Sequence, residues 1–228
     1  RAVVLEGEGG RLALVSCDLI CFPVGLATQI RQAVAEATGI PVDAVLLCAT
    51  HTHTGPTMGL VAKDLPVHRE WLAALPDRIV ATVRQAAGSM FAATLFAGRR
   101  EETKVGSNRL GRLPDGSEAF SKTGVLGPAG PIDPEVLALA IRDEEGELRA
   151  VVGNYAMHPD VIGGGSADFL SADWPGEVGR ALAGIYGDGV VTVFLNGTCG
   201  DINHHVWEPT RLPRSGPAKA VQMGRALA

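Results

Sequence analysis

The sequence has few aromatic residues, no excess of positive charge and no long apolar run. Aromatic residues make up 5% of the 228 residues, hydrophobic residues 46%, and the formal net charge is −5. Without a basic stripe, nucleic-acid binding is not expected. No apolar run approaches the ~20 residues that span a bilayer, so no transmembrane segment is expected. These features predict a soluble globular protein, cytoplasmic or secreted, and leave its oligomeric state open.

The sequence is also poor in cysteine. Cys17, Cys21, Cys48 and Cys199 form no C-x-x-C pair, and their density is too low for a disulfide framework. Free buried thiols are the default interpretation, since free cysteine behaves as a small hydrophobe. Cys199 differs from the others because it lies in a glycine-containing turn after an apolar run.

The length fits one large domain, and we expect a single domain over residues 1–228. The sequence opens on Arg1 without a starting methionine, and its last residues have a helical pattern. We therefore expect the domain to be truncated at both ends.

Apolar patterns predict strands and helices in alternation, with hairpins mixed in. This favours an α/β fold with a mixed β-sheet core and flanking helices. Residues 106–131 are rich in Gly, Pro, Ser and Asn and are predicted to be an irregular loop. The predicted strands are 3–5, 12–17, 42–48, 92–97, 137–142, 148–155 and 190–195, and the predicted helices are 25–38, 66–88, 174–185 and 218–227.

The most informative segment is Ala-Thr-His-Thr-His-Thr-Gly-Pro at 49–56, directly after the apolar run 44–48. In an extended chain residues i and i+2 point the same way, so His51 and His53 can face one pocket. Neutral imidazole is a common zinc ligand. The alternative is a polar strand end in which both histidines only satisfy local hydrogen bonds.

Two further segments combine a predicted strand end or helix start with a polar side chain. His158, fixed by Pro159, ends the predicted strand 148–155, as His51 ends an earlier one. A lone histidine of this kind is more often structural than a ligand, although a pocket shared with His51 is plausible. Asp173 precedes a predicted helix and fits a helix cap, or a carboxylate that orients a ligating histidine.

The segment 195–205 runs from a strand into a turn that contains Gly197 and Gly200. Its exposed backbone N–H groups suit an oxyanion or a carboxylate, while the simpler interpretation is a tight turn. His204 and His205 point to opposite sides if extended, so at most one of them can join a pocket.

Asn108 and Arg109 lie inside the predicted irregular loop. A loop arginine is normally a solvated surface group, but beside a metal it could hold a substrate oxyanion.

Taken together, these ordered motifs resemble the catalytic domain of the neutral/alkaline non-lysosomal ceramidases and their bacterial relatives. The motifs are Asp18-Leu19, residues 50–56, Asn108-Arg109, His158-Pro159, Ala-Asp-Trp-Pro-Gly at 172–176, and Asn196-Gly197 through Gly200-Asp201. They span most of the chain in the family's order.

The resemblance implies a zinc-dependent hydrolase of an amide or ester bond in a small-molecule or lipid-like substrate. It makes His51 and His158 ligands of Zn²⁺ and places His53 and Arg109 in the active site. We expect a metal-activated water to attack the carbonyl, with His53 as a proton shuttle. Arg109 and the turn at 196–201 would stabilise the oxyanion.

Further substrate contacts are expected from Asn108, Gly200 and Asp201. The family's zinc site also uses a glutamate and a tyrosine from further along the chain, and no segment of this sequence matches them.

The sequence departs from the family at one catalytic position. Ceramidases carry a serine in a Gly-Asp-x-Ser-Pro segment, where this chain has Asn203 followed by His204. Asparagine can donate a hydrogen bond but cannot take the role of that hydroxyl, so another amide or ester is as plausible a substrate as ceramide. Two alternatives stay open: acyl transfer by Cys199 with a histidine base, and a catalytically degenerate relative that binds its ligand without turnover.

Overall fold

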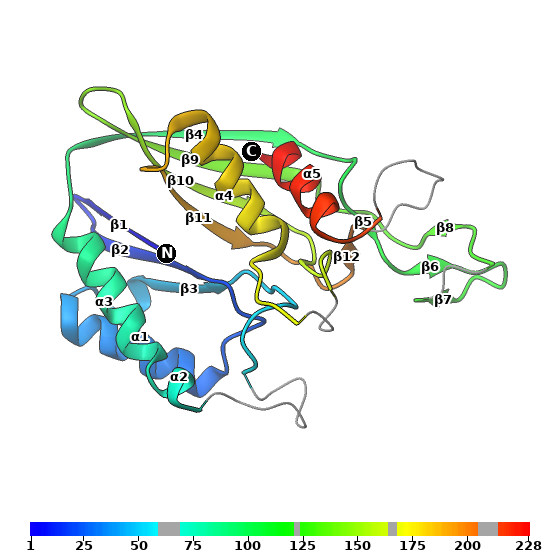
Figure 1. Ribbon diagram of the computed structural model, residues 1–228, viewed down its shortest axis with the longest axis horizontal. Coiled ribbons are helices and arrows are strands. Elements are labelled where there is room, and N and C mark those ends of the chain that lie inside the picture. Colours follow the sequence, from blue (N-terminus) through cyan, green and yellow to red (C-terminus); the bar gives the residue numbers. More distant parts are fainter. Residues whose placement is uncertain (59–68, 121–123, 164–167, 205–213) are drawn as a thin grey trace.

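Two mixed β-sheets lie face to face at the centre of the molecule, and helices cover their outer faces (Figure 1). The structure is a computed structural model that describes residues 1–58, 69–120, 124–163, 168–204 and 214–228. The strands are β1 (Ala2–Gly7), β2 (Gly10–Cys17), β3 (Val45–Ala49), β4 (Ala93–Glu101), β5 (Ser107–Asn108), β6 (Gly111–Arg112), β7 (Glu118–Ala119), β8 (Gly127–Pro128), β9 (Glu135–Asp143), β10 (Leu148–Tyr155), β11 (Val191–Asn196) and β12 (Ile202–Asn203). The helices are α1 (Val24–Thr38), the 3₁₀ turn η1 (Val42–Ala44), α2 (Arg69–Ala73), α3 (Leu75–Gly88), α4 (Asp173–Tyr186) and α5 (Pro217–Leu227).

Each large sheet joins one hairpin to one parallel strand. The first has the order β1-β2-β3, with β1 antiparallel and β3 parallel to β2. The second has the order β11-β10-β9-β4, in which only β10 and β11 run parallel. The α/β class with a mixed-sheet core, expected from the sequence, is thus confirmed.

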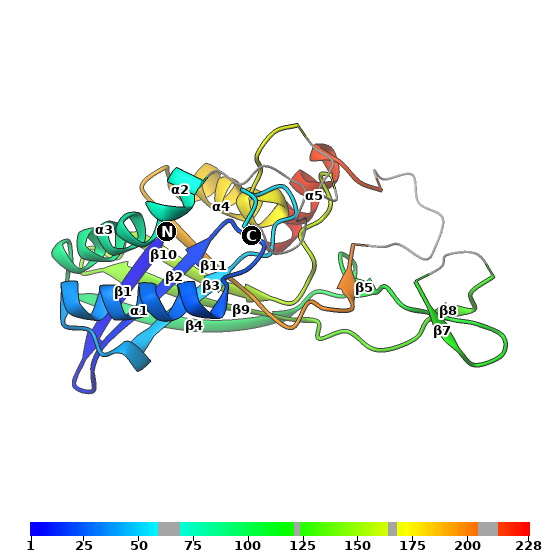
Figure 2. The ribbon, with the colours of Figure 1, turned by 90° about the horizontal axis from the view of Figure 1, so that it is seen from below.

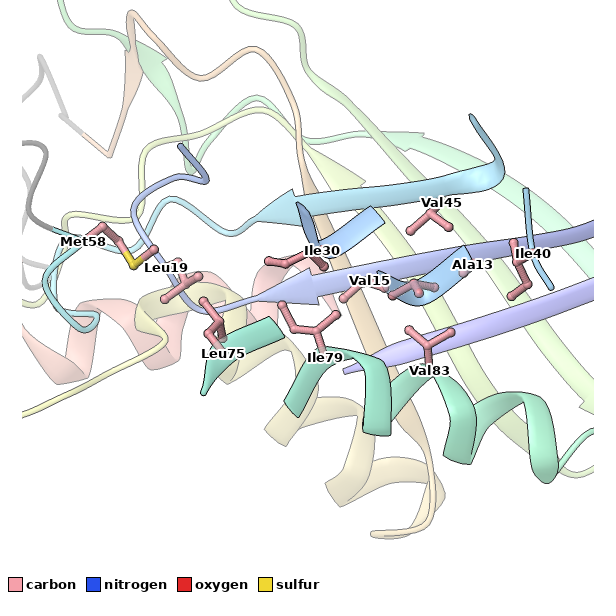
Figure 3. Packing of buried hydrophobic residues seen from close by; sticks show 11 residues of the cluster. Ala13, Val15, Leu19, Ile30, Ile40, Val45, Met58, Leu75, Ile79 and Val83 are labelled. Carbon is pink, nitrogen blue, oxygen red and sulfur yellow. The ribbon is translucent and has the colours of Figure 1, made fainter. Parts of the chain in front are cut away.

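Alternation along the strands creates separate apolar layers. On β2, Ala13 and Val15 face α1 and α3, where they pack against Ile79 and Val83 (Figure 3). Leu14, between them in sequence, points the opposite way and packs against residues of the second sheet. Strands with both faces buried read as apolar runs, and the molecule has four layers in the order helix, sheet, sheet, helix.

The other helical layer covers the second sheet. Trp174 and Val178 of α4 and Met223 of α5 pack with Tyr155 and Phe194 from β10 and β11. Trp174 makes edge-to-face contacts with Phe194 and Tyr155, at ring-centroid distances of 4.9 Å and 6.4 Å. Such pairs add about 1 kcal/mol each beyond area burial, so this aromatic group fixes α4 on the sheet.

Three local predictions were wrong in detail. Val42–Ala44 forms a 3₁₀ turn rather than the start of a strand, because Pro41 fixes its own φ and lacks an N–H. The helix predicted over 66–88 is divided at Ala74, directly before Leu75-Pro76, and its first residues lie outside the described ranges. The loop predicted over 106–131 contains the short strands β5 to β8, and β7 and β8 project away from the helices (Figure 2).

The strands β3, β10 and β11 end close together, and this edge carries the polar segments singled out from the sequence. The Gly197 N–H donates to Tyr155 O over 3.1 Å, and Asn196 Nδ2 donates to Thr50 O over 2.9 Å. These bonds tie together the first residues after the three strands. Within the described residues no helix has the length and apolar character needed to cross a membrane.

Candidate metal centre

Two imidazoles from different sheets meet at this edge. His51 follows β3 and His158 follows β10, and their Nε2 atoms lie 3.1 Å apart. Each Nδ1 atom lies 2.7 Å from a backbone carbonyl oxygen, of Ile20 for His51 and of Cys199 for His158. A carbonyl oxygen only accepts hydrogen bonds, so each Nδ1 carries a proton, and in the neutral form of each ring Nε2 presents a lone pair.

Two lone pairs that face each other at this distance repel unless a cation lies between them. Nitrogen ligands of one tetrahedral zinc, each about 2.05 Å from the metal, are about 3.3 Å apart, close to the observed separation. The Nδ1–carbonyl bonds match the usual way in which ligating histidines are oriented. Burial lowers the pKa of His158, which disfavours a shared proton near neutral pH. The pair therefore fits a metal ion.

The threonines of the histidine segment hold its backbone and leave the imidazoles free. Thr52 Oγ1 and Thr54 Oγ1 donate to Ser171 O over 2.7 Å and 3.1 Å, and both threonines are buried. A side chain on Gly55 would place its Cβ 2.9 Å from Asp18 O, so this turn requires glycine. The segment is thus fixed on two sides by other parts of the chain.

The convergence of His51 and His53 does not come from strand alternation. The strand ends at Ala49, and His51 has a φ of 70°, in the left-handed region that non-glycine residues rarely adopt. The two rings nevertheless lie 5.2 Å apart because the chain turns between them. His51 and His53 thus lie close together because of a turn, and not because residues i and i+2 of a strand point the same way.

His158 is positioned through its main chain. Its N–H donates to Ile202 O over 2.9 Å, and its carbonyl accepts from Trp174 Nε1 over 3.2 Å. His158 is 5% exposed, and its Nε2 atom faces that of His51.

His53 is the third ring of the cluster, 5.2 Å from His158 between ring centroids. Its Nε2 atom is buried and has no hydrogen-bond partner among the described residues. Burial lowers the pKa of His53, the charge of Asp160 opposes this shift, and His51 and Arg109 reinforce it. A neutral imidazole with an unpartnered nitrogen can accept a proton from, or donate one to, a bound molecule.

Arg109 supplies a cation beside the histidines. Its backbone N–H donates to the Asp201 carbonyl oxygen over 2.7 Å, and its guanidinium carbon lies 5.1 Å from the ring centroid of Phe120. The Nε atom is buried and unpartnered within the described part of the chain. Since its positive charge lowers the pKa values of both His53 and His158, Arg109 acts on the same site.

Cys199 lies in the turn after β11. Its Sγ, His51 and His158 form the one group of potential metal ligands found among the described residues, with ligand atoms all within 4.8 Å of one another. Burial raises the pKa of the Cys199 thiol above its ordinary value. An activated cysteine nucleophile usually shows the opposite shift.

The remaining predicted site residues have side chains that pair within the protein. Asn108 Nδ2 donates to Asp201 Oδ2 over 2.7 Å. Asn203 Nδ2 donates to Asp160 Oδ2 over 2.8 Å. Gly200 is exposed in the turn between them. The structure thus brings all of these residues to the same edge. Asn108 pairs with Asp201, however, and Asn203 pairs with Asp160.

Sequence reasoning missed Asp160, and it named Asn196 only as part of the turn at 196–201. Asn196 Nδ2 donates to Thr50 O and to Met157 O, at 2.9 Å and 3.2 Å, and Asn196 Oδ1 accepts from Met157 N over 3.3 Å. These partners are distant in sequence, so the linking role of Asn196 had no local signal. Asn196 links the segments that carry the two facing histidines.

Asp160 lies two residues after His158. Its Oδ1 lies 3.1 Å from His204 Nδ1, and its Oδ2 accepts from Asn203. Burial opposes ionisation of Asp160, but the hydrogen bonds to His204 and Asn203 dominate and lower its pKa to about 2. Asp160 is therefore an anion that faces the histidine cluster.

Asp173 does not contact either facing histidine. Its carboxylate accepts from the N–H groups of Ile162 and Trp174, over 2.9 Å and 2.7 Å. It joins the loop after His158 to the start of α4, with a φ of 56°. Asp173 therefore does not orient His51 or His158, whose Nδ1 atoms lie against the carbonyls of Ile20 and Cys199. His205, also considered, lies outside the described residues.

Comparison with known proteins confirms the resemblance. No family model matches the sequence. The chain is similar to the neutral ceramidase of Pseudomonas aeruginosa, with 26% identity over 95% of this chain and 33% of that protein. The crystal structure of that enzyme superposes with a TM-score of 0.74 and 21% identity, covering 97% of this chain and 36% of the enzyme.

A ceramidase complexed with C2 superposes with a TM-score of 0.71 and 20% identity, over 98% of this chain and 36% of that structure. The likeness to both structures shows a common fold. The chain spans about a third of the length of the proteins that it matches.

Proposed function

We propose that this chain carries the zinc-binding part of a neutral-ceramidase-like hydrolase that cleaves an amide bond, or an ester, in a lipid-like substrate. The observation that supports this most directly is the pair of Nε2 atoms, of His51 and His158, that face each other 3.1 Å apart with both Nδ1 atoms bonded to carbonyls. The sequence similarity to a neutral ceramidase supplies the reaction class.

In this proposal His51 and His158 hold the metal. A bound zinc ion supplies a Lewis acid that polarises a carbonyl and makes water nucleophilic at neutral pH. The carbonyls of Ile20 and Cys199 hold both Nδ1 atoms, so the two Nε2 atoms are oriented toward the metal position before the ion binds.

His53 moves the proton in this mechanism. Its unpartnered Nε2 takes the proton that the attacking water loses and returns it to the leaving nitrogen. Burial, which lowers its pKa, keeps the ring neutral and able to accept at pH 7.

Arg109 stabilises the negative charge that develops on the carbonyl oxygen. Its Nε–H is buried and has no partner among the described residues, so it can donate to that oxygen. The hydrogen bond from its backbone N–H to Asp201 and the Asn108–Asp201 pair fix the segment that carries the guanidinium. Asn203 acts through Asp160 and is a positioning residue here.

Exposed apolar side chains near the site favour a lipid-like substrate. Phe120 stacks on Arg109 and is 71% exposed. Phe169 and Leu170 are exposed as well, directly before Ser171, whose carbonyl accepts from Thr52 and Thr54. An acyl chain laid along these side chains would remove apolar surface from water.

The test is hydrolysis of a long-chain N-acyl sphingoid amide by the purified protein, compared with a short N-acyl amide and the matching ester. The proposal predicts cleavage of the long-chain amide or ester that stops after zinc chelation and returns on adding zinc. Metal-independent cleavage that is lost in Cys199→Ala would instead establish acyl transfer by Cys199 and overturn the proposal.

A second candidate function is ligand binding without turnover. The observation that favours it is Asn203, whose amide engages Asp160 where ceramidases have a catalytic serine. Zinc binding and saturable binding of the long-chain amide, without release of fatty acid, would establish this alternative.

A further inference from the structure

We infer that the thiolate of Cys199 is a third ligand of the metal held by His51 and His158. This inference rests on the proposed metal site and extends it with a ligand from the turn after β11, whereas the two histidines follow β3 and β10. The strongest support is the grouping of these three donor atoms within 4.8 Å of one another, at the meeting point of three strand ends.

The main chain of Cys199 is already part of the metal centre. Its carbonyl oxygen lies 2.7 Å from His158 Nδ1 and also accepts from Ile202 N over 3.1 Å. The same residue therefore orients one imidazole and carries a thiol beside it. The hydrogen bond between the Cys199 carbonyl and His158 Nδ1 couples the position of the Cys199 backbone to that of the His158 ring.

The distances allow direct coordination after a small rotation. In a tetrahedral site with zinc–nitrogen bonds of about 2.05 Å and a zinc–sulfur bond of about 2.3 Å, a nitrogen and the sulfur are about 3.6 Å apart. The separation of at most 4.8 Å then requires Sγ to move by about 1 Å. Rotation about the Cα–Cβ bond of a half-buried cysteine supplies such a movement without a change of backbone.

A polar amide lies beside the sulfur. Asn196 Nδ2 lies 3.5 Å from Cys199 Sγ and shares its two N–H groups between this sulfur and the carbonyls of Thr50 and Met157. Ligands of metals are commonly oriented by such outer contacts. When the sulfur–metal bond forms, the S–H bond breaks and its proton passes to solvent, so no further reactant is needed.

Cys48 provides the matched control. It is also half-buried, but its Sγ donates within its own strand to Ala49 O, over 3.3 Å. It does not belong to the group of potential ligands formed by His51, His158 and Cys199.

The experiment is cobalt(II) substitution, because a thiolate bound to Co²⁺ gives an intense sulfur-to-metal charge-transfer absorption in the near ultraviolet. The visible ligand-field bands report the bound metal itself, whatever its ligands. We compare the unchanged protein with Cys199→Ser, Cys199→Ala and Cys48→Ser, and circular dichroism confirms that each variant is folded.

We expect the charge-transfer band in the unchanged protein and in Cys48→Ser, and its loss in both Cys199 variants, with Co²⁺ affinity lowered about 10-fold to 100-fold. Ligand-field bands without a charge-transfer band in the unchanged protein would overturn the inference and leave the proposed function intact. Failure of the unchanged protein to bind Co²⁺ or Zn²⁺ would overturn both.

Discussion

The histidine segment at 50–54 follows β3 and the turn segment at 196–204 follows β11, but the two segments use their polar groups in opposite ways. In the first, threonine hydroxyls bond to Ser171 O and the imidazole Nε2 atoms are left facing each other. In the second, Asn196 and Asn203 donate to other protein groups. A polar side chain at a strand end is thus available for chemistry only where other residues make the hydrogen bonds that hold the local backbone in place.

The comparison separates two kinds of variant. Changes to His51, His158, His53 or Arg109 should alter metal binding or catalysis with little loss of stability. Changes to Asn196, Asp160 or Tyr155 should lower stability first, because their atoms have partners inside the protein.

The largest effect is expected from removing a facing imidazole. His51→Ala or His158→Ala should lower kcat/KM by at least about 10³-fold, because the metal supplies several kcal/mol of transition-state stabilisation. Steady-state kinetics with the long-chain amide measures this loss. His204→Gln is the control, since His204 pairs with Asp160 in the other segment. An equal loss in the control would remove the distinction between the segments.

Removal of the guanidinium should have the next largest effect. Arg109→Ala should lower kcat by about 10²-fold to 10³-fold, the usual cost of losing one oxyanion donor, with zinc affinity unchanged. Arg112→Ala removes an exposed arginine close by in sequence and should leave kcat unchanged. If Arg109→Ala changed only KM, Arg109 would bind the substrate without stabilising the transition state.

Substitution of Asn196 in the turn segment is expected to lower the stability of the protein. Asn196→Ala should lower the free energy of unfolding by about 2–3 kcal/mol, because it leaves the buried polar groups of Thr50 and Met157 without their partner. Urea unfolding measures this change. Asn154→Ala, which removes the single bond to Leu195 O, should cost about 1 kcal/mol. A smaller loss for Asn196→Ala than for Asn154→Ala would contradict the linking role of Asn196.

The smallest effect concerns Tyr155, whose hydroxyl donates to Glu102 O over 3.0 Å. Burial raises the pKa of Tyr155 to about 12. Its contribution to stability is therefore full below about pH 10, the pKa of tyrosine in the unfolded chain, and is lost as the pH rises through 12. Tyr155→Phe should cost about 1 kcal/mol at pH 8 and show a weaker decline between pH 10 and 12. Tyr186→Phe, at an exposed position, should keep the decline of the unchanged protein.

Much of the fold could be predicted because its signals are local. The alternation within Leu12–Cys17 and the helical spacing of Leu26, Ile30 and Val34 depend on neighbouring residues, and β2 and α1 lie where they indicate. The division into two sheets could not be predicted in this way. It depends on Leu14 packing against the opposite sheet, a contact between residues far apart in the sequence.

The site shows the same limit. The pattern of histidines and the family resemblance identified His51 and His158, which the structure brings together. The roles of Asn196 and Asp160 were missed because they depend on partners distant in sequence, such as Thr50 for Asn196. The left-handed backbone of His51 could not be predicted either, because a histidine after a strand normally stays extended.

Zinc titration of the metal-free purified protein in a calorimeter measures whether His51 and His158 hold one metal ion. We expect close to one zinc bound per chain, and no binding at the same concentrations in the double variant His51→Ala/His158→Ala. Undiminished zinc binding by a folded double variant, or none by the unchanged protein, would show that these two histidines do not hold a metal.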